Sequence, residues 1–321
     1  MNRYHLLHVT EFVYDGPVSE SYNEVRLRPM HDDNQSCLSF RLSTLPASPA
    51  FSYRDALGNW VHQVNVLPAH SKLRVQAESV VLTHDAPATT SFMQLGEMEL
   101  REEELQEEFY DMLAASKYVP HLPDLSPLIA EAEARCDGTV AGFAHRASDL
   151  IHERFQYVKG ATHVNSSITD SLHLGAGVCQ DFAHLLLGVL RKRGIPARYV
   201  SGYLVPQNKD NPAAKLEEVI GGQASHAWAE AYIPDSDWVP LDPTLGKPVG
   251  MRHVRVAYGR DYSDVAPVRG VYKGHAGQRL SVDVSVRPAI DDSGHETLAE
   301  SAAVPLEPEP VETRAQQSGQ Q

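Results

Sequence analysis

The chain has 321 residues, 42% of them hydrophobic, which is enough for a sizeable core and suggests two domains or one large domain with additions. Its net charge of -14 argues against nucleic acid as a partner, because phosphate binding needs basic side chains. The sequence shows no signal-peptide pattern and no run of ~18 apolar residues, so it predicts no membrane association. Three cysteines, Cys37, Cys136 and Cys179, do not make a disulfide framework and favour a reducing, cytoplasmic location.

Residues 1–85 consist of short runs rich in Val, Leu, Tyr and Phe, separated by turn residues. Asp15-Gly16-Pro17 is one of the groups of turn residues that punctuate these runs. Strands at this regular spacing are typical of a sandwich of antiparallel sheets. We therefore predict a β-rich N-terminal domain over residues 1–85.

The composition predicts three further segments: a helical and proline-rich connector, a larger domain that mixes helices and strands, and a disordered acidic tail. They cover residues 86–127, 128–290 and 291–321, respectively. Periodicity and charge predict helices over Glu97–Ala115, Leu128–Arg135 and Thr139–Phe155.

The clearest helix covers Gln180–Arg193. Its apolar side chains recur at helical spacing and form one stripe: Phe182, Leu185, Leu186, Val189 and Leu190. Gly194 and Pro196 then end the helix. The strand-like runs "ARYVSGYLV", "SHAWAEAYIP" and "DWVPLDPT" follow, so we predict an α+β fold in which this helix packs on an antiparallel sheet.

Cys179 stands at the edge of the apolar stripe, where the helix begins. Gly175, Ala176 and Gly177 allow the backbone to turn tightly before it. A helix N-terminus favours the thiolate, which is the nucleophilic form of cysteine, and its unpaired N–H groups can hold an oxyanion. The position therefore indicates a nucleophile.

A nucleophilic cysteine needs a base, and the base needs an orienting group. His226 and Asp242 can supply both if the two strands that follow the helix are neighbours. Each residue alone has a simpler interpretation: Cys179 as a small core residue, His226 as a satisfied polar residue of a sheet, and Asp242, before Pro243, as a turn opener. The combination with the glycine-rich turn favours catalysis.

The motifs "GAGVCQDFAHLLLGVLRKRGIPARYVSGYL", "ASHAWAEAYIP" and "WVPLDPT" together resemble the core of the transglutaminase-like superfamily. The resemblance implies a papain-like core with a triad of Cys179 as nucleophile, His226 as base and Asp242 as orienting residue. The stretches "SYNEVRLRP" and "DALGNWVHQVNV" resemble the N-terminal domain of bacterial members, and "GRDYSDVAPVRGVYKG" resembles their closing segment. The likeness covers residues 1–290.

The resemblance implies a thioester acyl-enzyme and leaves open what resolves it. A peptidase or amidase would use water, whereas a transglutaminase would join glutamine side chains to amines. A non-catalytic scaffold is the third hypothesis, against which the intact triad argues. Aromatic residues make up only 7% of the chain, which leaves little surface for an amine tunnel. We therefore expect a cysteine peptidase or amidase that acts on a peptide or protein substrate and needs no cofactor.

Four residues near the triad are further candidates. Gln180 is a candidate second oxyanion donor, and Asp181 is expected to satisfy N–H groups in the first helical turn. His184 is expected to pack or hydrogen-bond beside the site. Trp228 shares a strand face with His226 and either lines the cleft or belongs to the core. The sixteen histidines include no HExxH pattern, so we expect no metal.

Overall fold

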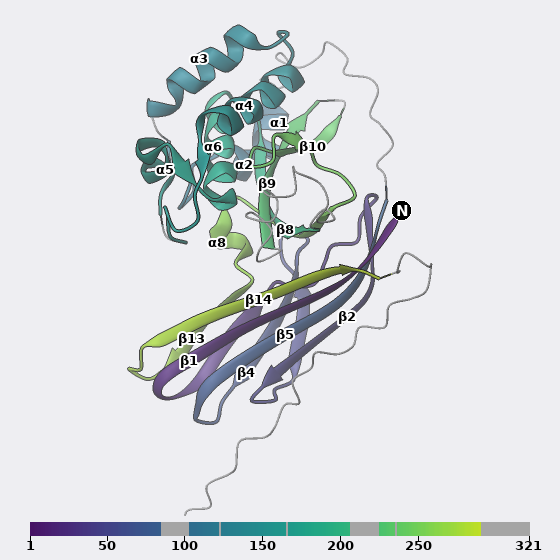
Figure 1. Cartoon of the computed structure of the whole chain (residues 1–321), viewed down its shortest axis with the longest axis vertical. Coiled ribbons are helices and arrows are strands. Elements are labelled where there is room, and N and C mark those ends of the chain that lie inside the picture. The colour runs from purple at the N-terminus through teal and green to yellow at the C-terminus, as the bar shows by residue number, and fades with distance from the viewer. Residues whose placement is uncertain (85–102, 122, 165, 206–224, 235, 290–321) are drawn as a thin grey trace, which may run out of the picture.

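The computed structural model describes residues 1–84, 103–121, 123–164, 166–205, 225–234 and 236–289. An antiparallel β domain lies below a helical domain that is built on a second antiparallel sheet (Figure 1). The predicted α+β class is confirmed. The tail over 291–321 and the first part of the predicted charged helix lie outside the described residues.

The N-terminal domain has two sheet layers that share one long strand, β1 (Asn2–Val25). The first part of β1 pairs with β5 (His70–Thr83), and its last part pairs with β4 (Trp60–Val66). Apolar side chains from both layers meet in a common core, which includes Val18, Val64 and Leu73. The outer strands on this side are β2 (Gln35–Leu45), beside β5, and β3 (Ala50–Arg54), beside β4.

The turn residues Asp15-Gly16-Pro17 lie inside β1, at the point where the strand passes from one layer to the other. The register of β1 against β5 shifts between Val13 and Val18, which marks an irregularity where the strand leaves one layer for the other. Proline and glycine are tolerated at such points because the regular hydrogen-bond ladder is already interrupted. At these residues the chain folds back from one layer to the other, while pairing with the neighbouring strands continues on both sides.

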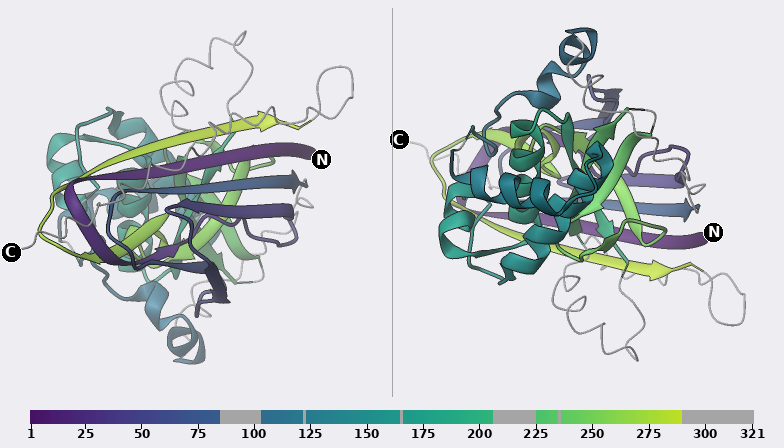
Figure 2. Two further views of the ribbon diagram at one scale, coloured as in Figure 1. Left: turned by 90° about the horizontal axis from the view of Figure 1, so that it is seen from below. Right: turned by 90° about the horizontal axis from the view of Figure 1, so that it is seen from above.

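Two C-terminal strands complete the N-terminal domain. Both β13 (Val268–Lys273) and β14 (Gln278–Pro288) pair antiparallel with β1, and they run beside it in all views (Figures 1 and 2). The division by sequence grouped these strands with residues 128–290, whereas their backbone partners lie at the other end of the chain. The chain thus leaves the N-terminal domain, forms the helical domain, and returns.

The helical domain is built on a five-stranded antiparallel sheet with the order β11-β10-β9-β8-β12. Its strands are β8 (Ala197–Leu204), β9 (Ser225–Ile233), β10 (Asp237–Asp242), β11 (Lys247–Pro248) and β12 (His253–Gly259). Its helices are α1 (Glu103–Glu108), α2 (Tyr110–Leu113), η2 (Pro123–Leu125), α3 (Ser126–Arg135), α4 (Val140–Arg154), α5 (Ile168–Leu174), α6 (Cys179–Lys192) and α8 (Tyr262–Val265). A two-stranded parallel pair, β6 (Gln156–Tyr157) and β7 (Ala176–Gly177), precedes α6.

The central helix α6 begins and ends within one residue of the predicted helix over Gln180–Arg193. The sequence suggested one buried stripe, but every residue from Asp181 to Arg191 is buried, so all faces of the helix are covered. The sheet, α3, α4 and α5 pack around it, so its polar side chains need partners inside the protein. Arg191 finds them in carbonyl groups, including that of Ala197.

Two buried amide side chains join the domains. Gln35 donates to the carbonyl of Arg255 (2.8 Å) and accepts from its N–H (2.7 Å), and Asn59 makes the same pair of bonds with Tyr258 (2.7 Å each). Both amides are fully buried. Because β12 is an edge strand of its sheet, these amides satisfy backbone groups that no further strand covers.

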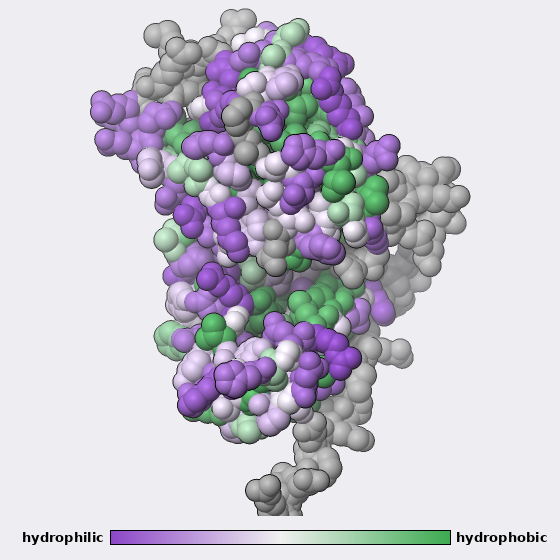
Figure 3. Space-filling model, turned by 90° about the vertical axis from the view of Figure 1, so that its left-hand side faces the viewer, coloured by the Kyte–Doolittle hydropathy of each residue, from purple (hydrophilic) through white to green (hydrophobic). Residues whose placement is uncertain are grey.

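Figure 3 shows a face that is mostly hydrophilic, with hydrophobic side chains in the hollow between the two domains and on parts of the helical domain. No helix among the described residues is both long and apolar enough to cross a membrane.

Replacement Gln35→Leu should lower the free energy of unfolding by about 1–3 kcal/mol, because the N–H of Arg255 would stay buried without the amide oxygen. Urea denaturation monitored by fluorescence measures the change. Gln63→Leu is the control, because Gln63 lies exposed on β4. Equal urea midpoints for the two variants would contradict the expected contribution of the Gln35 amide to stability.

Candidate active site

Cys179 is the first residue of α6 and is partly exposed. The residues just before Cys179 are held by the parallel pair β6–β7, in which the N–H of Val158 donates to the carbonyl of Gly177 (2.9 Å). Gly175 ends α5 in the left-handed conformation, with φ 60°, which glycine adopts without strain. The glycine-rich turn predicted before the nucleophile is therefore present and fixed at both ends.

Asp181 holds the start of α6. One of its oxygens, Oδ2, accepts from the N–H of Val178 (2.8 Å) and from the hydroxyl of Thr162. A Cβ at position 177 would come within 2.7 Å of that oxygen, so only glycine fits there. The predicted capping role of Asp181 is thus seen in the structure, and it fixes the backbone on which Cys179 lies.

His226 and Asp242 meet in the buried centre of the site. The strands that carry them, β9 and β10, are neighbours, and the Nε2–H of His226 donates to Oδ2 of Asp242 (2.7 Å). The other carboxylate oxygen, Oδ1, accepts from the N–H groups of Thr244 (2.9 Å) and Leu245 (3.2 Å). Neither the imidazole nor the carboxylate is exposed to solvent.

The protonation of this pair follows from its charges. Burial alone would lower the pKa of His226, but attraction to Asp242 and interaction with Cys179 raise it to about 10. Burial alone would raise the pKa of Asp242, but the charge and hydrogen bond of His226 lower it below its usual range. At neutral pH the buried pair is therefore an imidazolium and a carboxylate.

The sulfur of Cys179 lies near enough to the imidazole for their interaction to contribute to the raised pKa of His226. Nε2 is occupied by Asp242, which leaves Nδ1 for the sulfur. Nδ1 has no hydrogen bond of ordinary length with any residue that the structure describes. A loose contact of this kind is common between catalytic groups before substrate binds.

His253, which the sequence analysis did not select, completes the surroundings of Asp242. It is the first residue of β12, and its Nε2 lies 3.2 Å from Oδ2 of Asp242. In the sequence, this position shows only a histidine that follows a glycine, Gly250, and begins a strand. That pattern is common. Its role becomes visible once β12 lies near the end of β10.

His226, Asp242 and His253 also present three ligand atoms within 4.8 Å of one another, as a metal site does. However, the N–H of Gly250 donates to Nδ1 of His253 (3.2 Å), which puts the proton of a neutral His253 on Nε2. The Nε2 atoms of both histidines then direct protons at the carboxylate. A metal ion would have to displace both protons, so we interpret the cluster as a hydrogen-bond network.

The other three predicted site residues have different surroundings. The side-chain amide of Gln180 donates to the carbonyl of Val164 (3.1 Å) and holds a neighbouring loop. His184 is buried, stacks on Tyr118 and accepts from the N–H of Tyr262 (3.2 Å), as expected for a packing role. Trp228 is fully buried, with its ring 6.1 Å from that of His226, so it forms the core behind the imidazole.

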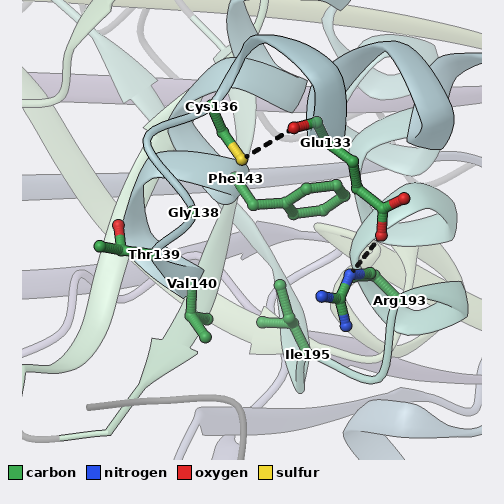
Figure 4. A pocket seen from close by; sticks show the side chains of 8 residues that line it. All are labelled: Glu133, Cys136, Gly138, Thr139, Val140, Phe143, Arg193 and Ile195. Atoms are coloured by element: carbon green, nitrogen blue, oxygen red, sulfur yellow. Dashed lines mark hydrogen bonds and ion pairs between the residues drawn. The ribbon is translucent and has the colours of Figure 1, made fainter. Parts of the chain in front are cut away.

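A pocket of about 210 Å³ lies beyond the C-terminal end of α6, away from Cys179 (Figure 4). Phe143 forms part of its wall, and Glu133 and Arg193 form an ion pair beside it (2.8 Å). Cys136 also lines this pocket, and its sulfur contacts the carbonyl of Glu133. The pocket therefore contains none of the residues of the Cys179 site.

Comparison with known proteins gives matches for both domains. Residues 130–243 match the family model of the transglutaminase-like superfamily, and residues 4–82 match that of the bacterial transglutaminase-like N-terminal region. Uncharacterized protein ML0607 of Mycobacterium leprae is 35% identical over 289 residues, which are 89% of this chain and 99% of that one.

Two further matches differ in extent. A Pseudomonas aeruginosa protein named protein-glutamine gamma-glutamyltransferase is 33% identical over 130 residues, which are 39% of this chain and 18% of that one. The crystal structure of a Cytophaga hutchinsonii protein, named as a candidate cysteine protease, superposes with a TM-score of 0.67 at 21% identity. That alignment covers 91% of this chain and 92% of the other, so the two share a fold.

Replacement Asp242→Asn should lower the pKa of His226 from about 10 toward or below its ordinary 6.5, because burial then acts without the carboxylate charge. In the wild type, the raised pKa contributes stability that is complete below pH 6.5 and is lost as the pH rises through about 10. The variant should lack this contribution. NMR titration of the histidine ring signals measures the change directly.

The control is Asp283→Asn, which makes the same chemical change at an exposed position of β14. It should leave the titration of His226 as in the wild type. If His226 in the Asp242→Asn variant kept its proton to the same pH as the wild type, the carboxylate would not be what holds that proton.

Proposed function

The chain belongs to the transglutaminase-like superfamily, and we propose that it is a thiol-dependent peptidase or amidase in which Cys179, His226 and Asp242 act as a triad. The observation that carries the proposal is the buried imidazolium–carboxylate pair beside a partly exposed thiol at a helix start. A reducing compartment would keep that thiol free, so we also propose a cytoplasmic location.

The first half of the reaction forms an acyl-enzyme. The thiolate of Cys179 attacks the carbonyl carbon of an amide, and the carbonyl electrons move onto oxygen. As the oxyanion collapses, the C–N bond breaks and His226 gives its proton to the leaving amine. A thioester on Cys179 and a neutral His226 remain.

The second half releases the product. Neutral His226 takes a proton from water, whose oxygen attacks the thioester carbon. The C–S bond then breaks, the free acid leaves, and the thiolate–imidazolium pair is restored. Asp242 is a positioning residue in both halves, since it fixes the tautomer of His226 and stabilises its charged form.

The start of α6 is the proposed oxyanion site. The N–H groups of the first helical turn have no acceptor within the helix, and those of Cys179 and Gln180 lie next to the sulfur in sequence. Backbone donors fixed in this way stabilise the charge that develops on the carbonyl oxygen. The side-chain amide of Gln180 is committed to Val164, so we assign it no direct part.

Water is the proposed acceptor because the aromatic residues near the triad are used elsewhere. Trp228, Tyr199 and Tyr203 are buried in the core, with 0–3% exposure. Trp238 packs against Phe109 and Tyr232 near α2. Among the described residues, these side chains do not stand free to wall a tunnel for an amine. Amine transfer is the alternative, which the name of the Pseudomonas relative favours.

Replacement Cys179→Ala should remove turnover without lowering the thermal unfolding midpoint, because the change is small and lies at the edge of the core. Brief treatment with iodoacetamide should label Cys179 first in the wild type. Burial raises the pKa of Cys37, which leaves less reactive thiolate there. Peptide mass mapping identifies the labelled residue, and Cys37→Ala and Cys136→Ala are controls that should keep activity.

Incubation with a glutamine-containing peptide and an excess of a primary amine should yield the hydrolysed peptide as the main product. The physical reason is that water reaches the thioester without a dedicated tunnel. Product masses distinguish the two reactions, since hydrolysis and amine addition change the peptide mass differently. An excess of amine adduct would favour the transferase over the hydrolase.

A further inference from the structure

The carboxylate of Asp242 is held by more than the imidazole of His226. Its Oδ2 lies between two imidazole nitrogens, Nε2 of His226 at 2.7 Å and Nε2 of His253 at 3.2 Å. The backbone N–H groups that bind Oδ1 complete a set of four donors. All of these groups are buried, so each donor substitutes for water that the carboxylate has lost.

His253 is fixed in the orientation that makes it a donor. The backbone N–H of His253 donates to the carbonyl of Gly250 (2.8 Å). The backbone N–H of Gly250 in turn donates to the ring Nδ1 of His253 (3.2 Å). Burial lowers the pKa of His253, against the opposing effect of Asp242, so the ring is neutral at neutral pH. A neutral ring that accepts at Nδ1 must carry its proton on Nε2, toward Asp242.

The strand that carries His253 is also held in place. It pairs with β8 on one edge, and the amides of Gln35 and Asn59 bind its other edge at Arg255 and Tyr258. The indole of Trp228 packs edge-on against the ring of His253, with centroids 5.3 Å apart. These contacts leave His253 little freedom to move away from the carboxylate.

We propose that His253 is a positioning residue that keeps Asp242 stable as an anion while His226 is neutral. This role rests on the proposed function, in which His226 gives its proton to the leaving amine and so removes the positive charge beside Asp242. Without the Nε2–H of His253, the carboxylate would hold the proton of His226 more tightly. Donation to the leaving amine would then be slower.

The effect of losing His253 should depend on the leaving group of the substrate. An amine needs a proton from His226 in order to leave, whereas p-nitrophenolate is stable enough to leave without one. Loss of His253 should therefore slow acylation by an amide and spare acylation by a p-nitrophenyl ester. Structural damage to the site would slow both reactions.

The test uses His253→Leu and His253→Gln, which have side chains of similar size and differ in their ability to donate. The probes are a glutamine-containing peptide and p-nitrophenyl acetate, with rates expressed per Cys179 titrated by iodoacetamide. His253→Leu should lower kcat for the peptide about tenfold, the effect of one lost hydrogen bond to a charged group, with KM unchanged. His253→Gln should restore most of that loss, and both variants should react with the ester at the wild-type rate.

His62→Leu is the matched control, because His62 is about as buried as His253 and lies on β4 of the N-terminal domain. Its rates per titrated thiol should equal those of the wild type. If His253→Leu does not fold, His253→Asn takes its place, because its side chain is one methylene shorter than that of Gln and we expect its amide to fall short of Asp242.

Equal peptide rates in the wild type and His253→Leu would overturn the role of His253, as would equal slowing of the peptide and the ester. A Gln variant as slow as the Leu variant would overturn the assignment as a donor. If Cys179 of the wild type reacted with neither probe, the proposed function itself would fail, and this role would fail with it.

Discussion

The stability of one buried negative charge governs the construction of this site. A carboxylate without water is costly unless donors surround it, and Asp242 has none of its side chain exposed. Four donors from three separate segments converge on it: His226 from β9, His253 from β12, and the N–H groups of Thr244 and Leu245 from the turn after β10. The buried carboxylate therefore depends on β9, β10 and β12 lying together in one sheet.

The same requirement links the N-terminal domain to the chemistry. The strand β12 supplies one donor to Asp242 at its first residue and lies at the edge of its sheet. Gln35 and Asn59 from the N-terminal domain occupy that edge, where a further strand would otherwise be needed. After β12 the chain returns to the N-terminal domain as β13 and β14. The chain thus passes twice between the two domains, and hydrogen bonds also join them. The strand β12 connects the Gln35 and Asn59 contacts at its edge to the site at its first residue.

Sequence patterns were sufficient where the signal is local. The apolar spacing and the Gly194–Pro196 stop located α6, and the position of Cys179 at its start followed from them. The pairing of β9 with β10, and so the contact of His226 with Asp242, followed from two adjacent strand-like runs. Asp181 was correctly expected to hold the first turn, because capping depends on residues three apart.

Sequence patterns failed where the structure depends on distant segments. The turn-like residues at 15–17 mark a real change of layer, but the sequence does not show that strands from both ends of the chain pair with β1 on either side of it. His253 carries no local sign of its role, because its partner lies in another strand and the turn at Gly250 decides its tautomer. The hydrogen-bond partner of the Gln180 amide, the carbonyl of Val164, also lies in a loop that comes near only in the folded chain.

The exposure of Cys179, His226 and Asp242 limits how the proposed reaction can proceed. Cys179 is partly open to solvent, whereas the imidazole of His226 has no solvent-exposed surface. Its Nε2 is bound to Asp242, so in the proposed reaction protons enter and leave through Nδ1. The leaving amine and the incoming water would then use the same place beside Cys179, one after the other. The proposed acyl-enzyme fits this order, because it holds the acyl group while the first product departs and the acceptor takes its position.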